Sequence, residues 1–510
     1  MLAKTKSYSL TGIKGYDVDV EVDISNGLPT YETVGLGDTA VKESRERIRA
    51  SIKNSGLAYP VKRIVVNLAP ADTKKEGPLF DLAIAIGILV ASDQITTSTY
   101  KDYVIIGELS LDGTLRHVNG VMPILISAYQ QGYTKFLIPK ANENEAKYVE
   151  GIEVYPVSNL NEAVDMLNGT ATIYPVKHTV YESRRVTNAY GVDFSEVKGQ
   201  SIAKRALEIA VAGGHNVLMI GPPGAGKTML AKCVPSIMPE MSFEEALTVT
   251  KIHSVAGALD EKTGIVLNRP FRTPHHTATT VALTGGGAHC RPGEISMAHN
   301  GVLFLDELPE YSRQSLEILR QPLEDGVISV SRAIGTIEYP ARFMMIASMN
   351  PCPCGNYGSK KHPCTCTTQQ IHKYLSKLSG PLLDRIDLHI EVDGISYENL
   401  KDTTQLETSA QIKVRVDRAR QIQADRYKDE GIFTNAAMNN RLIDKHCRIS
   451  PAGEKLMQMA FDKLKLSARA GSRILKVART IADIDGNENI SEANIAEAIQ
   501  YRSLDRKYYL

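Results

Sequence analysis

VLMIGPPGAGKTML, residues 217–230, is the stretch around which the rest of the sequence can be organised. Its residues 221–228 fit the phosphate-binding loop pattern, in which two glycines separated by four residues are followed by Lys and then Ser or Thr. The apolar run before it predicts a short buried strand, and the residues after it predict a helix. Backbone N–H groups in such a loop turn inward, and the helix N-terminus adds partial positive charge. The alternative is a glycine-rich turn without a ligand, but the strand–loop–helix setting favours polyphosphate binding.

The residues of this loop are the candidate contacts for ATP. Lys227 is expected to reach the β- and γ-phosphates, and the Thr228 hydroxyl is expected to bind Mg²⁺. The full set of expected ATP contacts in this stretch is Gly221, Pro222, Pro223, Gly224, Ala225, Gly226, Lys227, Thr228 and Met229.

Two further apolar runs end in polar side chains of the kind that act on a bound nucleotide. Residues 301–305 lead into Asp306 and Glu307, and a strand would deliver both carboxylates at its carboxyl end, where α/β sheets bind ligands. We expect Asp306 to hold Mg²⁺ and Glu307 to polarise the attacking water. Residues 343–348 lead into Asn350, which can hydrogen-bond that water or the γ-phosphate. A turn asparagine before Pro351 is the alternative for Asn350.

Four of the seven cysteines are crowded into residues 352–366. They form two C-x-C pairs, Cys352 with Cys354 and Cys364 with Cys366, in a stretch of loop composition. Four thiolates on two short turns suit tetrahedral Zn²⁺, so we expect a structural zinc site. Free thiols and a redox pair are the alternatives, and His362 can replace one cysteine as a ligand.

The bulk composition excludes several classes of protein. The 59 basic and 58 acidic residues nearly cancel, so any nucleic-acid binding must come from local patches. The longest apolar run, residues 82–91, is too short to span a bilayer. The first residues do not resemble a secretory signal. We expect a cytoplasmic protein without a membrane contact.

The 510 residues are expected to form about three domains. Alternating and apolar runs predict strands at residues 16–24, 63–68 and 135–139, with helices at 41–54, 80–92 and 123–131. These elements make an α+β domain over residues 1–170, followed by a linker over 171–190. An α/β core with a parallel sheet is expected over 191–400. The last 110 residues predict a helical lid over 401–510, with helices at 411–428, 453–466, 470–484 and 491–502. The basic face of the first of these helices is either a solvated surface or a DNA contact.

The first domain resembles the Lon-protease-like domain, which has a ribosomal-S5-like fold. The matching stretches are residues 66–89, 112–128 and 136–143. Active relatives carry a nucleophilic serine in the first stretch and a lysine base in the second. Leu79 and Met122 stand at those places here, and neither can act as a nucleophile or a base. A scaffold or nucleic-acid-binding role is expected instead.

The core and lid resemble AAA+ ATPases. The LLDR stretch at residues 382–385 resembles the segment with the arginine finger, which places Arg385 in the site of a neighbouring subunit; a surface salt bridge is the alternative. SARA at residues 467–470 resembles the sensor 2 segment, which implies that Arg469 reaches the γ-phosphate from the lid. Residues 271–301 and 326–343 resemble the pore-facing inserts of magnesium chelatase relatives. There Arg272, His275 and His276 are candidate contacts to a nucleic-acid backbone, with structural histidines as the alternative.

Taken together, the order of segments resembles the YifB/ComM family of magnesium-chelatase-like AAA+ ATPases. This resemblance implies an AAA+ P-loop core with a helical lid behind an inactive Lon-like domain. It implies catalysis by Lys227, Glu307, Asn350, Arg385 and Arg469, with ATP and Mg²⁺. It also implies a nucleotide-dependent homo-hexamer that moves on single-stranded or branched DNA, as a branch-migration helicase in natural transformation. The alternatives are a chelatase-type motor that remodels a protein partner for metal insertion, a Lon-type protease, and a scaffold that only binds nucleotide.

Overall fold

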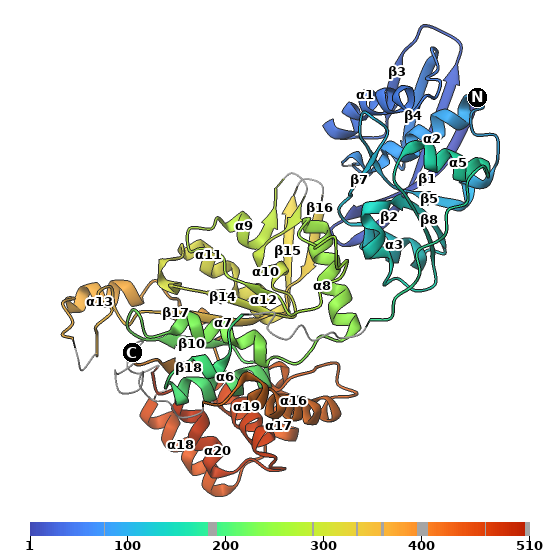
Figure 1. The fold of residues 1–510 in the computed structure, drawn as a ribbon. Coiled ribbons are helices and arrows are strands. Elements are labelled where there is room, and N and C mark those ends of the chain that lie inside the picture. The colour runs from blue at the N-terminus through green and yellow to red at the C-terminus, as the bar shows by residue number, and fades with distance from the viewer. Residues whose placement is uncertain are drawn as a thin grey trace.

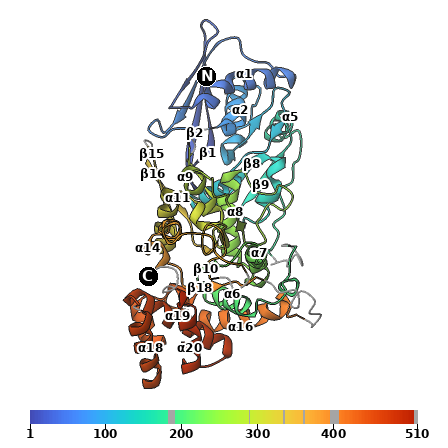
Figure 2. The ribbon, with the colours of Figure 1, turned by 90° about the vertical axis from the view of Figure 1, so that its left-hand side faces the viewer.

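The computed structural model describes residues 1–75, 77–181, 191–287, 290–332, 335–358, 362–394, 406–464 and 466–504. Three bodies follow one another along the chain: an N-terminal α/β body, a central body built on a parallel sheet, and a helical lid (Figure 1). The view at right angles shows the same order, with the central body between the other two (Figure 2). Residues 182–190 of the predicted linker lie outside the described residues.

The N-terminal body is organised on a seven-stranded sheet with the order β3-β4-β2-β1-β5-β8-β9. Its longest strands, β1 and β2, form an antiparallel hairpin around Gly12. Alternate residues of β2 are buried, as the period-two pattern predicts: Val18, Val20 and Val22 are fully buried. The strands of the sheet are β1 (Leu2–Thr11), β2 (Lys14–Ser25), β3 (Tyr31–Val34), β4 (Arg63–Ala69), β5 (Tyr103–Ile105), β8 (Lys135–Pro139) and β9 (Glu153–Val157). The other elements are β6 (Glu108–Leu109), β7 (Leu115–Arg116), α1 (Thr39–Asn54), α2 (Asp81–Ala91), α3 (Val121–Gln130), α4 (Glu143–Ala146) and α5 (Leu160–Asn168).

The most apolar run of the sequence is α2, and all of its residues are buried inside the N-terminal body. It is a core helix, since none of the described helices is both long and apolar enough to cross a membrane. Leu79 and Met122, which stand at the places of the protease dyad, pack into one apolar cluster. Neither position therefore offers a group that can attack a peptide bond.

The central body contains five parallel strands in the order β11-β14-β17-β10-β18. The strand that ends at Asn350 thus lies between the strand that feeds the P-loop and the strand that ends at Asp306. The predicted hairpin over residues 326–343 is confirmed by β15 and β16. The strands are β10 (Val217–Ile220), β11 (Phe271–Arg272), β12 (Gly285–Gly286), β13 (Arg291–Pro292), β14 (Val302–Leu305), β15 (Val327–Arg332), β16 (Gly335–Pro340), β17 (Met344–Met349) and β18 (Leu388–Glu391). The helices are α6 (Ser201–Gly213), α7 (Lys227–Ile237), α8 (Phe243–Ala256), α9 (Thr280–Thr284), α10 (Glu294–Met297), α11 (Arg313–Ile318), α12 (Arg320–Asp325), α13 (Thr368–Leu375) and α14 (Gly380–Leu383).

The lid is helical, as the sequence predicts. It comprises α16 (Ser409–Arg426), α17 (Asn440–His446), α18 (Pro451–Leu464), α19 (Ala468–Asp485) and α20 (Glu492–Gln500). The basic side chains of α16 bind groups within the chain: Arg415 pairs with Glu208 on α6, and Arg426 pairs with the buried Asp483 on α19. These contacts favour a packing role for α16 over the DNA contact considered from the sequence.

The N-terminal body is fastened to the central body through α8, which lies beside α3. The hydroxyl of Ser254 on α8 accepts the N–H of Gly120 at 3.1 Å and donates to the carboxylate of Glu145 at 2.7 Å. Both Ser254 and Glu145 are buried. A second contact joins the β1–β2 turn to β16, because a Cβ at Gly12 would lie 2.5 Å from Cγ2 of Ile337.

We expect Ser254→Ala to loosen this junction. The change leaves one position on the buried Glu145 carboxylate unfilled, which costs about 1–3 kcal/mol. Hydrogen–deuterium exchange should therefore rise around Gly120 and in α8. Thr248→Ala is the matched control, because the Thr248 hydroxyl bonds only to Glu244 O of the same helix. Equal exchange in the two variants would show that Ser254 does not hold the bodies together.

Candidate functional site

The loop between β10 and α7 has the geometry of a phosphate cradle. A Cβ at Gly221 would lie 2.1 Å from the carbonyl oxygen of Val392, so only glycine fits there. Gly224 and Gly226 have φ of 74° and 89°, a left-handed conformation that favours glycine. No side chain caps the N-terminus of α7, so its first N–H groups remain available to an anion.

Lys227 is held at the centre of this cradle, with 9% of its surface exposed. Its Nζ donates to the carbonyl oxygens of Gly221 at 2.7 Å and Pro222 at 2.9 Å, and to Oδ1 of Asn350 at 3.1 Å. Burial lowers the pKa of Lys227, and the charges of Asp306 and Glu307 oppose that shift. The ammonium group therefore sits where the phosphates of a nucleotide would meet it.

Asp306 is linked to helix α7 and to the neighbouring strand β17. The hydroxyl of Thr228 donates to Asp306 Oδ2 at 2.9 Å, and the hydroxyl of Ser348 on β17 donates to Oδ1. A carboxylate and a hydroxyl side by side are hard oxygen donors of the kind that Mg²⁺ prefers. Ser348 was not predicted from the sequence; its only signal was a lone hydroxyl inside an otherwise apolar strand.

These groups surround a single cavity of about 370 Å³, a size within the range of small-molecule sites. It brings together Lys227, Thr228, Asp306, Glu307 and Asn350, the residues that the sequence placed around a nucleotide. The complete lining is Pro223, Gly224, Ala225, Gly226, Lys227, Thr228, Met229, Asp306, Glu307, Ser348, Met349 and Asn350.

Arg385 and Arg469 do not line this cavity. Arg385 lies just beyond α14, where it pairs with Glu324 and donates to the carbonyl oxygen of Pro381 at 2.7 Å. Arg469 lies in the first turn of α19. The pKa of Glu324 is lowered first by Arg385 and also by the charges of Arg469 and Arg473. The two predicted arginines thus lie outside the cavity lining, and their contacts to a phosphate stay predictions.

The loop after β11 brings His276 to Glu307, a residue of the cavity lining. Nδ1 of His276 lies 3.3 Å from Oε2 of Glu307, and its ring packs against that of His275 at a centroid distance of 4.1 Å. Arg272 forms two hydrogen bonds of 2.6 Å with Glu294. The predicted nucleic-acid contacts of Arg272 and His276 are therefore directed at carboxylates of the same chain. Glu307 itself has φ of 53°, a strained conformation of the kind found at functional sites.

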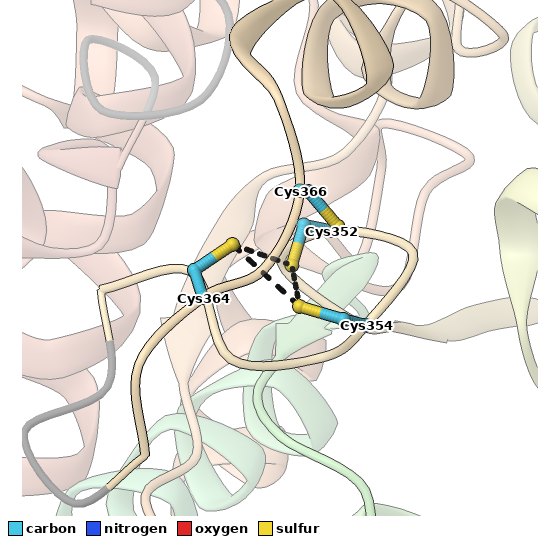
Figure 3. A group of neighbouring side chains, drawn as sticks. All are labelled: Cys352, Cys354, Cys364 and Cys366. Atoms are coloured by element: carbon cyan, nitrogen blue, oxygen red, sulfur yellow. Dashed lines mark hydrogen bonds between the residues drawn. The ribbon is translucent and has the colours of Figure 1, made fainter.

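The four cysteines of residues 352–366 converge from two turns (Figure 3). Their sulfur atoms all lie within 4.8 Å of one another. The sulfur of Cys352 lies 3.4 Å from that of Cys354 and 3.7 Å from that of Cys364. A disulfide would need about 2.05 Å, whereas the edge of a tetrahedron with Zn–S bonds of about 2.3 Å is about 3.8 Å. The arrangement can bind a metal ion, and none of the four cysteines forms a disulfide.

The parallel sheet, the P-loop and the two acids define a P-loop ATPase core of the AAA+ type. Three segments of the chain match family descriptions of magnesium chelatase subunit ChlI. Residues 193–400 match magnesium chelatase subunit ChlI, residues 20–142 match subunit ChlI of Mg-chelatase, and residues 406–502 match the C-terminal part of the subunit.

Two relatives are similar over nearly their whole length. The chain is 45% identical to competence protein ComM of Haemophilus influenzae, over 99% of this chain and 98% of ComM. It is 44% identical to YifB of Escherichia coli, over 97% of this chain and 96% of YifB. A shorter match, to DNA repair protein RadA of Aquifex aeolicus, has 38% identity over 20% of this chain and 22% of RadA. The chain belongs to the YifB/ComM family of magnesium-chelatase-like AAA+ proteins, which implies ATP and Mg²⁺ as its ligands.

We expect His276→Ala to lower ATP turnover several-fold while leaving nucleotide affinity nearly unchanged. The carboxylate of Glu307 would lose the ring that orients it, while the groups that bind phosphates stay in place. The measurement is kcat and KM for ATP in parallel. His178→Ala is the control, because His178 is an exposed histidine that does not line the cavity. A loss of affinity without a loss of kcat would contradict the role assigned to His276.

Proposed function

We propose that the protein is an ATP-hydrolysing ring motor that acts on DNA. One observation carries this proposal: Lys227, Thr228, Asp306, Glu307 and Asn350 arrive from three strands around one cavity. Such a set binds a nucleoside triphosphate with Mg²⁺ and positions a water for attack on the γ-phosphate.

Each residue of the cavity has a separate task. Lys227 neutralises charge on the phosphates, and its contact with Asn350 keeps the amide of Asn350 directed into the cavity. Thr228 and Asp306 hold Mg²⁺, which would supply charge neutralisation at the phosphates. Glu307 accepts a proton from the attacking water. Most of the catalysis in such sites comes from positioning and charge, so the hydrogen bonds between these residues matter more than any single group.

Arg385 completes the site of a neighbouring subunit, and Arg469 reaches the γ-phosphate from the lid. Arg385 pairs with Glu324 and lies outside the cavity of its own chain, so its contact with a phosphate requires a second chain. A ring supplies this contact in every subunit, because head-to-tail interfaces close into rings. We propose a homo-hexamer whose assembly depends on nucleotide.

DNA is the proposed substrate along which the motor moves. The full-length similarity is to a competence protein, and the shorter similarity is to a DNA repair protein. We therefore propose that the protein moves on single-stranded or branched DNA and drives branch migration of recombination intermediates during natural transformation. A chelatase-type motor that remodels a protein partner is the alternative, because the matching family descriptions carry the chelatase name.

We also propose that Cys352, Cys354, Cys364 and Cys366 bind Zn²⁺. The fit rests on the sulfur distances, which match a tetrahedral set of thiolates and exclude a disulfide. The backbone N–H of Tyr357 donates to the sulfur of Cys352 at 3.3 Å, an outer contact of the kind that orients metal ligands.

ATP turnover across a salt series, with and without branched DNA, tests the function. We expect DNA to raise turnover and the stimulation to fall steeply with salt, because phosphate contacts release counterions. Glu307→Gln should bind ATP but lose turnover by roughly 10²-fold or more. Glu310→Gln is the control, since Glu310 pairs with Lys377 on the surface. Stimulation by a porphyrin-binding protein and not by DNA would favour the chelatase-type motor.

Mixed rings test the trans arginine. Lys227→Ala and Arg385→Ala should each be inactive alone, with Arg385→Ala losing about 10³-fold or more in rate. Mixing the two should restore part of the activity, because some interfaces then pair an intact P-loop with an intact Arg385. Arg448→Ala, an exposed lid arginine, is the control for loss of a positive charge. Full activity of Arg385→Ala, or of an isolated monomer, would contradict the ring.

A further inference from the structure

We propose that the cysteine turn, residues 352–355, positions the P-loop of the nucleotide cavity. A metal ion bound by the four cysteines would hold Gly355 against Pro223 and so fix the conformation of the P-loop. This inference rests on the proposed ATPase function and zinc site. It goes beyond both, because it assigns the metal an effect on nucleotide binding that neither site alone implies.

The first observation is a direct contact between the two sites. Gly355, in the turn that joins Cys352 to Cys354 and continues beyond it, has φ of 80°. A Cβ at Gly355 would lie 2.4 Å from Cδ and 2.9 Å from Cγ of Pro223. The turn is closed by the N–H of Gly355, which donates to the carbonyl oxygen of Cys352 at 2.9 Å. The backbone of the cysteine turn therefore packs against the ring of Pro223, a P-loop residue that lines the cavity.

The second observation is that both ends of the cysteine segment lie next to Asn350. At its start, Cys352 follows Asn350 by two residues and is fully buried. At its end, α13 follows Cys366 and carries the buried Tyr374, which packs in the same apolar cluster as Met349, the neighbour of Asn350. Asn350 in turn accepts the hydrogen bond from Lys227. The cysteines thus lie on a loop that begins directly after Asn350, a residue of the nucleotide cavity.

The third observation concerns what gives this loop its shape. Within the described parts of it, residues 351–358 and 362–367, no residue belongs to a helix or a strand. Cys354, Cys364 and Cys366 are partly exposed, and only Cys352 is buried. Little apolar burial or backbone pairing therefore holds the two turns together, so a metal ion that bridges them is the main constraint on the position of Gly355.

Gly355→Ala changes the contact between Gly355 and Pro223 but leaves all four cysteine ligands in place. We expect zinc content, measured by atomic emission, to stay at one ion per chain. Affinity for a fluorescent ATP analogue should fall about tenfold, a typical effect of an overpacked contact. Gly431→Ala is the matched control: Gly431 also has positive φ, 67°, but a Cβ there meets no atom within 4 Å. It reports the effect of backbone strain alone.

A double variant distinguishes a loss of affinity caused by the Gly355–Pro223 contact from one caused by misfolding. Pro223→Ala removes the two ring atoms that a Cβ at position 355 would meet. Gly355→Ala should therefore cost less affinity in the Pro223→Ala background than in the natural chain. An equal loss in both backgrounds would contradict the proposed contact, whether or not zinc is retained.

Cys364→Ser tests the metal itself, at a ligand on the turn that does not carry Gly355. We expect lower zinc content together with the same loss of nucleotide affinity, and a matching loss when a chelator removes zinc from the natural chain. Zinc-free protein that binds the analogue with natural affinity would overturn the inference. If the natural chain failed to hydrolyse ATP, the proposed function would fail instead. If it hydrolysed ATP and Gly355→Ala behaved like Gly431→Ala, only the present inference would fail.

Discussion

The parallel pairing of β10, β17 and β14 is the constraint on which the rest of the molecule depends. Its register sets Ile220 beside Met349 and Leu305 beside Ala347, so the three strands end at one edge of the sheet. Side chains that follow them must then meet there, and the hydrogen bonds of Lys227 to Asn350 and of Thr228 to Asp306 are the result. The three strands are fully buried, and a slip by one residue would exchange the side chains that pack in the two apolar clusters on either face of the sheet. Stability and site geometry are therefore set by the same apolar packing.

The other parts of the chain are arranged around this edge. The loop after β11 brings His276 to Glu307, and the cysteine turn brings Gly355 to Pro223. The contacts of the N-terminal body with the central body include Ser254 on α8, Ile337 in the hairpin and the hydrogen bond from Asn144 to Glu261 O. His276 and Gly355 thus act on residues of the cavity lining, whereas the N-terminal body contacts the central body away from it.

Features that depend only on a few consecutive residues could be predicted from the sequence. The P-loop pattern, the two acids and the C-x-C pairs are each contained in a few consecutive residues, and the strands that precede them are apolar runs bounded by polar residues. The pairing of Ser348 with Asp306 and of His276 with Glu307 could not be predicted in this way, because it depends on which strands are neighbours and on how a long loop folds back. The basic pattern of α16 was ambiguous for the same reason: the partners of Arg415 and Arg426 are distant in sequence.

The pairing of Arg385 with Glu324 is compatible with a role in a second subunit. Glu324 has 61% of its side chain exposed, and exposed ion pairs contribute at most about 1 kcal/mol. Arg385 therefore gives up little when it exchanges this carboxylate for a phosphate. Its side chain is only 15% exposed, and Nε, which is buried, has no hydrogen-bond partner among the described residues. The side chain is thus held in place by packing, and its ion pair with the exposed Glu324 is the contact that a phosphate on a neighbouring chain would replace.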